Sequence, residues 1–380
     1  NNMEFLWEGV MAITPQQVVM YLIGGLLIWL AVKKEYEPAL LLPMGFGAIM
    51  VNLPLSGVIN QVTEGIGETQ GIIQWLFETT ISASEALPIL LFIGIGAMID
   101  FGPLLSQPIM FLFGAAAQFG IFFAICAASL MGFELRDAAS IGIIGAADGP
   151  TSILVSQIMH SNYVGAIAVA AYSYMALVPI VQPFCIRLIT TKKERMIRME
   201  YTPGKITKTT RILFPIVVTV IAGIVSPQSV ALVGFLMFGN LLRECGVLRS
   251  LSETAQNVLA NLISLLLGLT VAVRMQAESF LVPETLMILG LGLIAFMFDT
   301  FGGVLFGKLI NLFAKKKINP MIGAAGISAF PMSSRVIAKM AKEEDPYNFI
   351  LMQAAGANVA GQVASVIAGG IILALVGPLV

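Results

Sequence analysis

The chain has 380 residues, of which 57% are hydrophobic and only 11% are charged, and its mean hydropathy is +0.90. Since a soluble domain carries about 25% charged residues, this composition indicates an all-α polytopic membrane protein. A net charge of −1 excludes a basic nucleic-acid-binding protein. The single histidine and three scattered cysteines exclude a zinc ribbon, a multi-histidine metal centre and a disulfide scaffold.

Apolar runs near the length of a membrane crossing recur along the whole chain. About 20 residues of helix span the hydrocarbon core of a bilayer. Glycines within these runs allow close helix approach, as is typical of membrane bundles. We predict about ten helical segments in a single membrane domain covering residues 1–380, with apolar runs at 16–32, 40–53, 86–99, 109–132, 164–186, 212–225, 229–242, 258–273, 285–313 and 347–380.

The distribution of charge predicts how the chain is oriented. Lysine and arginine are absent between Lys34 and Arg136, and they crowd between residues 192 and 211. Basic residues beside membrane spans stay in the cytoplasm. Lys33, Lys34 and the 192–211 loop are therefore predicted inside, and the acidic stretch 64–78 is predicted outside.

Two apolar segments cannot be simple crossings in this orientation. Residues 138–159 must begin and end outside, and Asp148-Gly149-Pro150 lies at their middle. Residues 320–334 lie between two predicted cytoplasmic groups, Lys315–Lys317 before them and Arg335 after them. We therefore predict two re-entrant, broken-helix hairpins that enter the membrane from opposite sides.

The two hairpins also resemble each other in sequence. Ile144-Gly145-Ala146-Ala147 in the first recurs as Ile322-Gly323-Ala324-Ala325 in the second. Together with their opposite directions, this match predicts two inverted repeats, a first half at roughly 86–190 and a second at roughly 257–380. Hairpins of such repeats meet near the midplane, where transporters place an ion or substrate site.

Asp148 is the residue that points most strongly to chemistry. A carboxylate deep in a membrane costs a few kcal/mol on insertion scales. Gly149 and Pro150 interrupt the helix beside it and free backbone groups that need partners. With the hydroxyls of Thr151 and Ser152 these oxygens suit a hard cation such as Na⁺. The alternative is that Asp148 only caps the second half-helix, since Asp is a favoured N-cap residue.

The second half of the chain offers neutral oxygens for the same ion. Asn319 precedes the second hairpin, Ser328 lies near its tip, and Ser333 and Ser334 follow. Asn358 interrupts an otherwise apolar span. One carboxylate with several neutral oxygens would balance one monovalent cation, and a proton could replace that cation. The alternative for each residue is interhelical hydrogen bonding, which is common in bundles.

Several other polar residues leave two interpretations open. Tyr172 and Tyr174 either reach the site or serve packing. Asp299 lies inside a span, as a second ionisable site or as a partner of Arg274. Arg335 either anchors a hairpin end or binds an anion.

Four motifs together resemble a known family. The segments 41–47 (LLPMGFG), 145–151 (GAADGPT), 168–179 (AVAAYSYMALVP) and 319–326 (NPMIGAAG) are similar to the β subunit of the biotin-dependent sodium-pumping decarboxylases, and the resemblance covers nearly the whole chain. Such complexes decarboxylate oxaloacetate, methylmalonyl-CoA or glutaconyl-CoA. The compact length resembles the acyl-CoA branches more than the oxaloacetate branch, with the glutaconyl-CoA type as the first expectation.

The resemblance implies a function and a set of residues. The β subunit would receive carboxybiotin, with the biotin on a partner subunit, release CO₂, consume a proton and export Na⁺. It implies a multi-pass protein of the prokaryotic inner membrane, partnered by a biotin carrier, a carboxyltransferase and a small membrane-anchor subunit, with homo-oligomerisation left open. The implied catalytic residues are Asp148, Tyr174 and Arg335, the implied Na⁺ ligands are Asp148, Asn319, Ser328 and Asn358, and the supporting hairpin residues are Gly149, Pro150, Thr151 and Gly323.

The resulting hypothesis is that Asp148 binds Na⁺ from the cytoplasm, and that a proton from outside then displaces the ion outward. One alternative is a stand-alone secondary transporter that moves a small carboxylate with Na⁺. Another is a structural membrane anchor for a soluble enzyme, which leaves a buried Asp at a helix break without a purpose.

Overall fold

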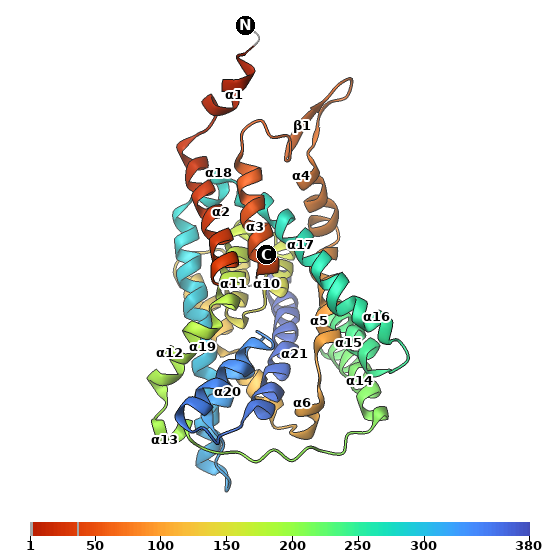
Figure 1. The fold of residues 1–380 in the computed structure, drawn as a ribbon, viewed down its shortest axis with the longest axis vertical. Coiled ribbons are helices and arrows are strands. Elements are labelled where there is room, and N and C mark those ends of the chain that lie inside the picture. The colour runs from red at the N-terminus through yellow and green to blue at the C-terminus, as the bar shows by residue number, and fades with distance from the viewer. Residues whose placement is uncertain (1–2, 36–37) are drawn as a thin grey trace.

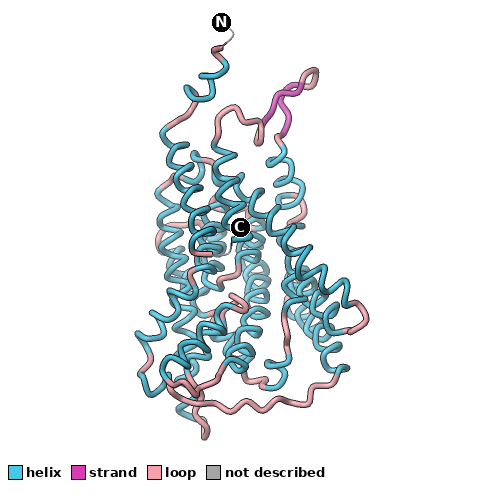
Figure 2. Tube along the Cα trace, viewed as in Figure 1, coloured by secondary structure: helices cyan, strands magenta, loops and turns pink. Residues whose placement is uncertain are grey.

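The computed structural model describes residues 3–35 and 38–380, and this part of the chain is almost entirely helical (Figures 1 and 2). Its one sheet is a short antiparallel hairpin of β1 (Asn60–Thr63) and β2 (Gly67–Gln70). Six helices of the described part are long and apolar enough to cross a membrane, and up to eight spans result if each of two bent helix pairs counts as one. The prediction of an all-α polytopic membrane protein is confirmed.

The first third of the chain forms two antiparallel helices and a bent helix pair. The bend between η1 and α5 is 68°, and Glu85, the residue before α5, has a left-handed backbone (φ 49°) that does not continue a helix. The elements are α1 (Phe5–Met11), α2 (Pro15–Lys33), α3 (Pro38–Asn52), α4 (Ile72–Phe77), η1 (Glu78–Ser82), α5 (Ala86–Met98), α6 (Gly102–Ser106), α7 (Met110–Ala116) and α8 (Phe119–Leu130).

A group of lateral helices, α14 to α17, packs against α5 and lies on the right in Figure 1. The loop that precedes it runs along the bottom of the molecule from α13 to α14. The elements of this part are α14 (Lys208–Val225), η3 (Pro227–Ser229), α15 (Val230–Glu244), α16 (Arg249–Thr254), η4 (Ala255–Leu259), α17 (Ala260–Val271), η5 (Ala272–Met275) and α18 (Ala277–Phe280).

The remaining helices build the part of the bundle that holds both hairpins. The long helices α19 and α21 run through it beside the broken ones (Figure 1). Its elements are α9 (Leu135–Gly142), η2 (Ile143–Ala146), α10 (Gly149–Ile158), α11 (Val164–Ala176), α12 (Val178–Ile189), α13 (Lys192–Arg195), α19 (Pro283–Phe313), η6 (Pro320–Gly326), α20 (Met332–Glu344), α21 (Leu351–Val376) and η7 (Gly377–Leu379).

One predicted span is not a straight helix. The run 164–186 is divided into α11 and α12, which are bent by 71°. Pro179 lies in the first turn of α12. Proline has no N–H to donate and clashes with the preceding turn, so the helix is interrupted there. Membrane helices often tolerate a proline, so the presence of Pro179 in the sequence does not by itself predict a bend.

Ion pairs group the helix ends as the charge pattern predicts. Arg211, at the start of α14, contacts Asp100 (2.9 Å) and Glu244 (3.7 Å) from the ends of α5 and α15. Lys308 near the end of α19 contacts Glu194 (3.3 Å) in the 192–211 loop. Arg211 and Glu194 belong to the loop that is predicted to be cytoplasmic, and Lys308 precedes Lys315–Lys317, so these contacts agree with the predicted orientation.

Candidate ion-binding site

The first hairpin runs through α9, η2 and α10 and returns to the side from which it starts. Asp137 near the start of α9 accepts hydrogen bonds from Ser161 Oγ (2.7 Å) and from the backbone N–H of Asn162 (3.0 Å), both just after α10. Residues 137–157 between these ends are all buried. These contacts confirm the re-entrant hairpin predicted at 138–159.

The helix breaks where Asp148-Gly149-Pro150 predicts. Ala147 has a left-handed backbone (φ 53°), and Asp148 is extended and caps α10. Gly149 is covered by the ring of Tyr172 from α11, and a Cβ atom at this position would lie 2.1 Å from the ring. Only glycine therefore fits between the break and this ring.

The second hairpin consists of η6, a turn and α20, and both of its ends are held by the end of α13 and the residues that follow it. Asn319 at its start donates from Nδ2 to the carbonyls of Arg195 (3.0 Å) and Ile197 (3.1 Å). At its other end Glu344 pairs with Arg195 (3.2 Å). The segment predicted at 320–334 thus returns to the side from which it starts, which is the side predicted to be cytoplasmic, and its second arm extends to Glu344.

The tips of the two hairpins meet. The backbone N–H of Ser328 donates to the carbonyl of Ala146 at 3.0 Å. The helix α21 passes close by, since a Cβ at Gly361 would lie 2.1 Å from the carbonyl oxygen of Gly326. We call this contact region of Ala146–Asp148 with Gly326–Ser328 the hairpin crossing.

The Asp148 carboxylate lies at the hairpin crossing and is only 3% exposed. Its Oδ2 accepts hydrogen bonds from Thr151 Oγ1 (2.7 Å) and from Ser365 Oγ of α21 (2.9 Å). Its Oδ1 accepts from the backbone N–H of Thr151 (3.2 Å). Asp148 therefore does cap α10, but its carboxylate is also held by a helix from the other half of the chain.

Further oxygens of α21 lie along the same helix face. Gln362 Oε1 accepts a hydrogen bond from Ser328 Oγ (3.0 Å), and the Ser328 side chain also lies close to Asp148. Asn358 Nδ2 donates to the carbonyl of Ile327 (2.9 Å). Asn358, Gln362 and Ser365 are four and three residues apart, which places them on one face of a helix.

Some of the residues predicted for the site are brought together and others are not. The crossing contains Asp148 and Ser328. Thr151 and Asn358 contact it directly, and Gly149 and Pro150 lie beside it in the first turn of α10. Gly323 lies before the tip, where a Cβ would be 1.8 Å from the Gly303 carbonyl oxygen of α19.

Three predicted residues lie in other surroundings. Asn319 lies at the mouth of the second hairpin, where its carboxamide donates to the carbonyls of Arg195 and Ile197. The Tyr174 hydroxyl donates to the carbonyl of Leu289 on α19. Arg335 is exposed and lines a surface cavity of about 450 Å³ with Lys339 and Lys342.

Ser365 and Gln362 are the contacts that the sequence-based prediction of the site omitted. Gln362 belongs to a polar interruption of the last span that the sequence does reveal, and its spacing from Asn358 and Ser365 is the signal that identifies all three. The sequence leaves open whether Tyr172 or Tyr174 reaches the site, because nothing in it distinguishes the sides of the helix on which the two lie.

The donor set suits a monovalent hard cation. The described residues contain no cluster of three His, Cys, Asp or Glu side chains that could hold a transition metal or a divalent ion. One carboxylate surrounded by hydroxyl and amide oxygens has the ligands that hard cations prefer. The hydroxyl groups donate to the carboxylate here, and a hydroxyl can rotate to present its lone pairs to an ion.

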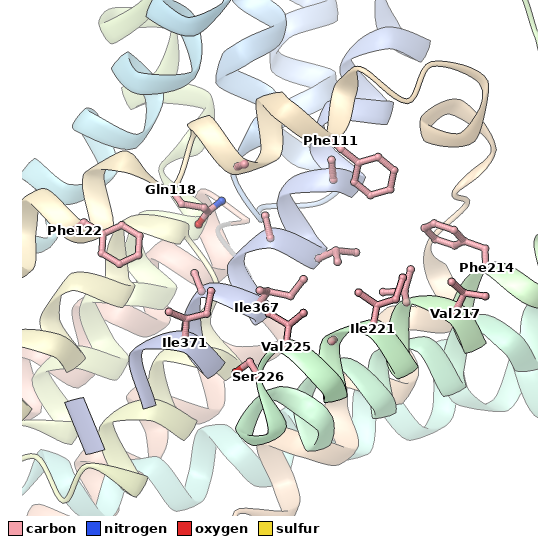
Figure 3. Close-up of a pocket in the computed structure, with 17 residues that line it drawn as sticks. Phe111, Gln118, Phe122, Phe214, Val217, Ile221, Val225, Ser226, Ile367 and Ile371 are labelled. Carbon is pink, nitrogen blue, oxygen red and sulfur yellow. The ribbon is translucent and has the colours of Figure 1, made fainter. Parts of the chain in front are cut away.

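A cavity of about 660 Å³ is lined by residues of α21 other than Asn358, Gln362 and Ser365. Figure 3 shows this cavity. Apolar side chains from α7, α8, α14 and α21 form its wall, among them Phe111, Phe214 and Ile367. Gln118 is one of its few polar residues. Because this wall lacks charged groups and carboxylates, the cavity is not the ion site.

Two re-entrant hairpins that enter from opposite sides and cross at a buried carboxylate define a membrane protein built to move an ion. Residues 16–376 match the family described as the Na⁺-transporting oxaloacetate decarboxylase beta subunit, and the chain belongs to this family. It is thus the multi-pass membrane β subunit of a Na⁺-pumping, biotin-dependent decarboxylase, which is a multi-subunit complex. This membership favours the pump over the stand-alone transporter and the anchor.

Curated relatives cover nearly the whole chain. A glutaconyl-CoA decarboxylase subunit beta of Acidaminococcus fermentans is 46% identical over 97% of this chain and 96% of its own. A methylmalonyl-CoA decarboxylase subunit beta of Propionigenium modestum is 44% identical over 97% of both chains. An oxaloacetate decarboxylase beta chain 2 of Salmonella typhi is 42% identical over 96% of both.

Proposed function

We propose that the hairpin crossing is the Na⁺ site of the pump, with Asp148 as its charged ligand. Thr151, Ser365 and Ser328 contribute hydroxyl oxygens, and Asn358 supports the tip of the second hairpin from α21. The observation that carries this proposal is the shared carboxylate, which α10 and α21 hold together through Thr151 and Ser365. Any relative movement of the two helices changes the ligand set.

The opposite directions of the hairpins support alternating access. The first hairpin opens to the outside and the second to the cytoplasm, so each provides half of a path to Asp148. Na⁺ enters from the cytoplasm, and a proton from outside displaces it at the carboxylate. That proton is then consumed as carboxybiotin breaks down to biotin and CO₂. The same geometry supports inverted repeats at roughly 86–190 and 257–380.

The residues away from the crossing are proposed for other steps. Arg335, exposed beside Lys339 and Lys342, offers a positive surface for the carboxylate of carboxybiotin. Tyr174 links α11, at the bend before α12, to α19 and is proposed for proton delivery. Asn319 is predicted as a Na⁺ ligand. We propose that it binds the ion only after its carboxamide has left the carbonyls of residues 195 and 197.

The complex is proposed to contain a biotin carrier, a carboxyltransferase and a small membrane-anchor subunit, with an acyl-CoA substrate. The glutaconyl-CoA and methylmalonyl-CoA relatives align over 370 and 368 residues at 46% identity, against 418 residues at 42% for an oxaloacetate relative. Of the acyl-CoA substrates, we propose glutaconyl-CoA as the first candidate. Assaying the isolated complex with each of the three substrates tests this choice, and turnover with oxaloacetate alone would contradict it.

Na⁺ transport by the complex in proteoliposomes tests the assigned site. Asp148→Asn is expected to abolish both Na⁺ uptake and the stimulation of decarboxylation by Na⁺. The matched control is Asp137→Asn, which alters a buried carboxylate at the mouth of the same hairpin and should leave Na⁺ stimulation in place. Full Na⁺ transport by Asp148→Asn would contradict the proposal.

A further inference from the structure

Asp299 is a second buried carboxyl group, and the proposed Na⁺ site does not use it. It lies near the middle of α19 and is 0% exposed. The alternative that it pairs with Arg274 is wrong, because the Arg274 guanidinium lies 4.9 Å from the centre of the Phe77 ring and interacts with Glu78. No ion pair among the described residues includes Asp299.

The Asp299 carboxyl has fewer hydrogen-bond donors than the Asp148 carboxylate. Its Oδ1 accepts from the backbone N–H of Ile121 (3.1 Å), in the first turn of α8, and the N–H of Gly120 also interacts with it. Its Oδ2 has no hydrogen-bond partner within the described residues. A buried carboxylate without a paired cation is strongly disfavoured, so the group needs a proton.

Asp299 is placed at the level of the hairpin crossing. Ala295, one turn before it, packs on Gly145 of the first hairpin, where a Cβ would lie 2.8 Å from the Ala295 Cβ. Gly303, one turn after it, packs on Gly323 of the second hairpin. Four residues of helix correspond to about 6 Å. Asp299 therefore lies between the contacts that α19 makes with the two hairpins.

The first turn of α8 links Asp299 to the tip of the second hairpin. A Cβ at Gly120 would lie 2.4 Å from Asp299 Oδ1, so the two helices are in direct contact. Gln118, just before α8, donates from Nε2 to the carbonyls of Gly114 (2.9 Å) and Gly326 (3.5 Å). A change in charge at Asp299 therefore acts on a helix end that holds the crossing.

The titratable groups around Asp299 lie on only some of the elements that pack against α19. The elements packed against α19 carry no titratable side chain in η2, η6 and α7. The titratable groups on the other packed elements and on α19 itself are Cys126, Arg136, Asp137, Tyr172, Tyr174, Cys185, Arg187, Glu284 and Lys308.

We propose that Asp299 is a proton-binding site of the pump, neutral as a carboxylic acid and exchanging its proton with water during the transport cycle. The exchange is a simple dissociation, in which the carboxylic acid releases a proton and becomes a carboxylate. Its role in transport rests on the proposed Na⁺ site, because the proton matters only if ion occupancy at Asp148 moves the hairpins.

Infrared difference spectroscopy of the reconstituted complex tests this site. The wild type with isotopically labelled aspartate should show the carbonyl stretch of a protonated acid that disappears in Asp299→Asn and persists in Asp137→Asn. The asparagine keeps an acceptor for Ile121. Na⁺-stimulated turnover of Asp299→Asn should fall at least about 5-fold, the lower end of ordinary coupling between sites.

The absence of such a band from the labelled wild type would overturn the inference even if the variant failed to assemble. The inference would also be overturned if the Asp299→Asn complex kept the turnover of the wild type and its dependence on pH. Asp299 would then serve only as a cap of α8. If Asp148→Asn loses Na⁺ transport in that case, the proposed function stands and only this inference fails.

Discussion

Replacing Ser365 by alanine removes the hydrogen bond that α21 donates to the Asp148 carboxylate. The Ser365 hydroxyl lies 2.9 Å from Asp148 Oδ2, and the other donors to this carboxylate come from Thr151. Loss of this hydroxyl removes one oxygen from the proposed Na⁺ shell. It also allows protons to compete better with Na⁺ for the carboxylate. Both effects weaken Na⁺ binding.

The size of the effect follows from the charge of the acceptor. A hydrogen bond to a charged group contributes about 1.5–3 kcal/mol. At about 1.4 kcal/mol for each factor of ten, the Na⁺ concentration that gives half-maximal decarboxylation should rise about 10- to 150-fold. The maximal rate at saturating Na⁺ should change much less, because Asp148 itself remains in place.

The assay is decarboxylation by the assembled complex as Na⁺ is varied at constant ionic strength. Ser156→Ala is the matched control, because Ser156 is equally buried in α10 but donates to the carbonyl of Ile153 (3.0 Å). A wild-type Na⁺ dependence in Ser365→Ala would refute the reasoning. An equal shift in both variants would also refute it, since the effect would then come from packing.

Three further perturbations test the structure around the crossing. Gly149→Ala places a methyl group against the Tyr172 ring and should destabilise the complex by about 1–3 kcal/mol, measured as a lower thermal midpoint; an unchanged midpoint would show that the ring can move away. Asp137→Ala removes the acceptor that joins the ends of the first hairpin, and it should expose residues 161–162 to protease while Asp137→Asn does so less; equal cleavage would contradict this. Hydrogen bonds from Arg198 hold the pKa of Asp345 below its ordinary value, so this contact is complete above that ordinary pKa and is lost as the pH falls through the lowered one. Proteolysis of the 195–199 loop should therefore increase in acid in the wild type but be insensitive to pH in Arg198→Ala, and a pH-insensitive wild type would count against the contact.

The two hairpins and the helix break could be predicted because they depend on local chemistry and on the number of membrane crossings between loops whose side is known. Basic residues fix the side of each loop, and the remaining apolar segments then have to turn back. Gly149 and Pro150 interrupt a helix wherever they occur together, and Asp148 is a favoured cap beside them. The meeting of the two tips also follows from their lengths and opposite directions.

The side-chain contacts between helices could not be predicted, because they depend on how each helix is rotated about its axis. Tyr172 and Tyr174 are two residues apart and point to different sides of α11, and only packing decides that Tyr172 covers Gly149. Asn319 is fixed by the loop at residues 195–197, which is more than 100 residues away in the chain. Neither arrangement leaves a local signal.

Equilibrium binding of radioactive sodium to the purified complex, without turnover, tests most directly whether ions bind where the two re-entrant segments touch. The wild type should bind Na⁺ saturably and in competition with protons, Ser365→Ala should bind it more weakly, and Asp148→Asn should not bind it measurably. Binding by Asp148→Asn with the wild-type affinity would contradict the account.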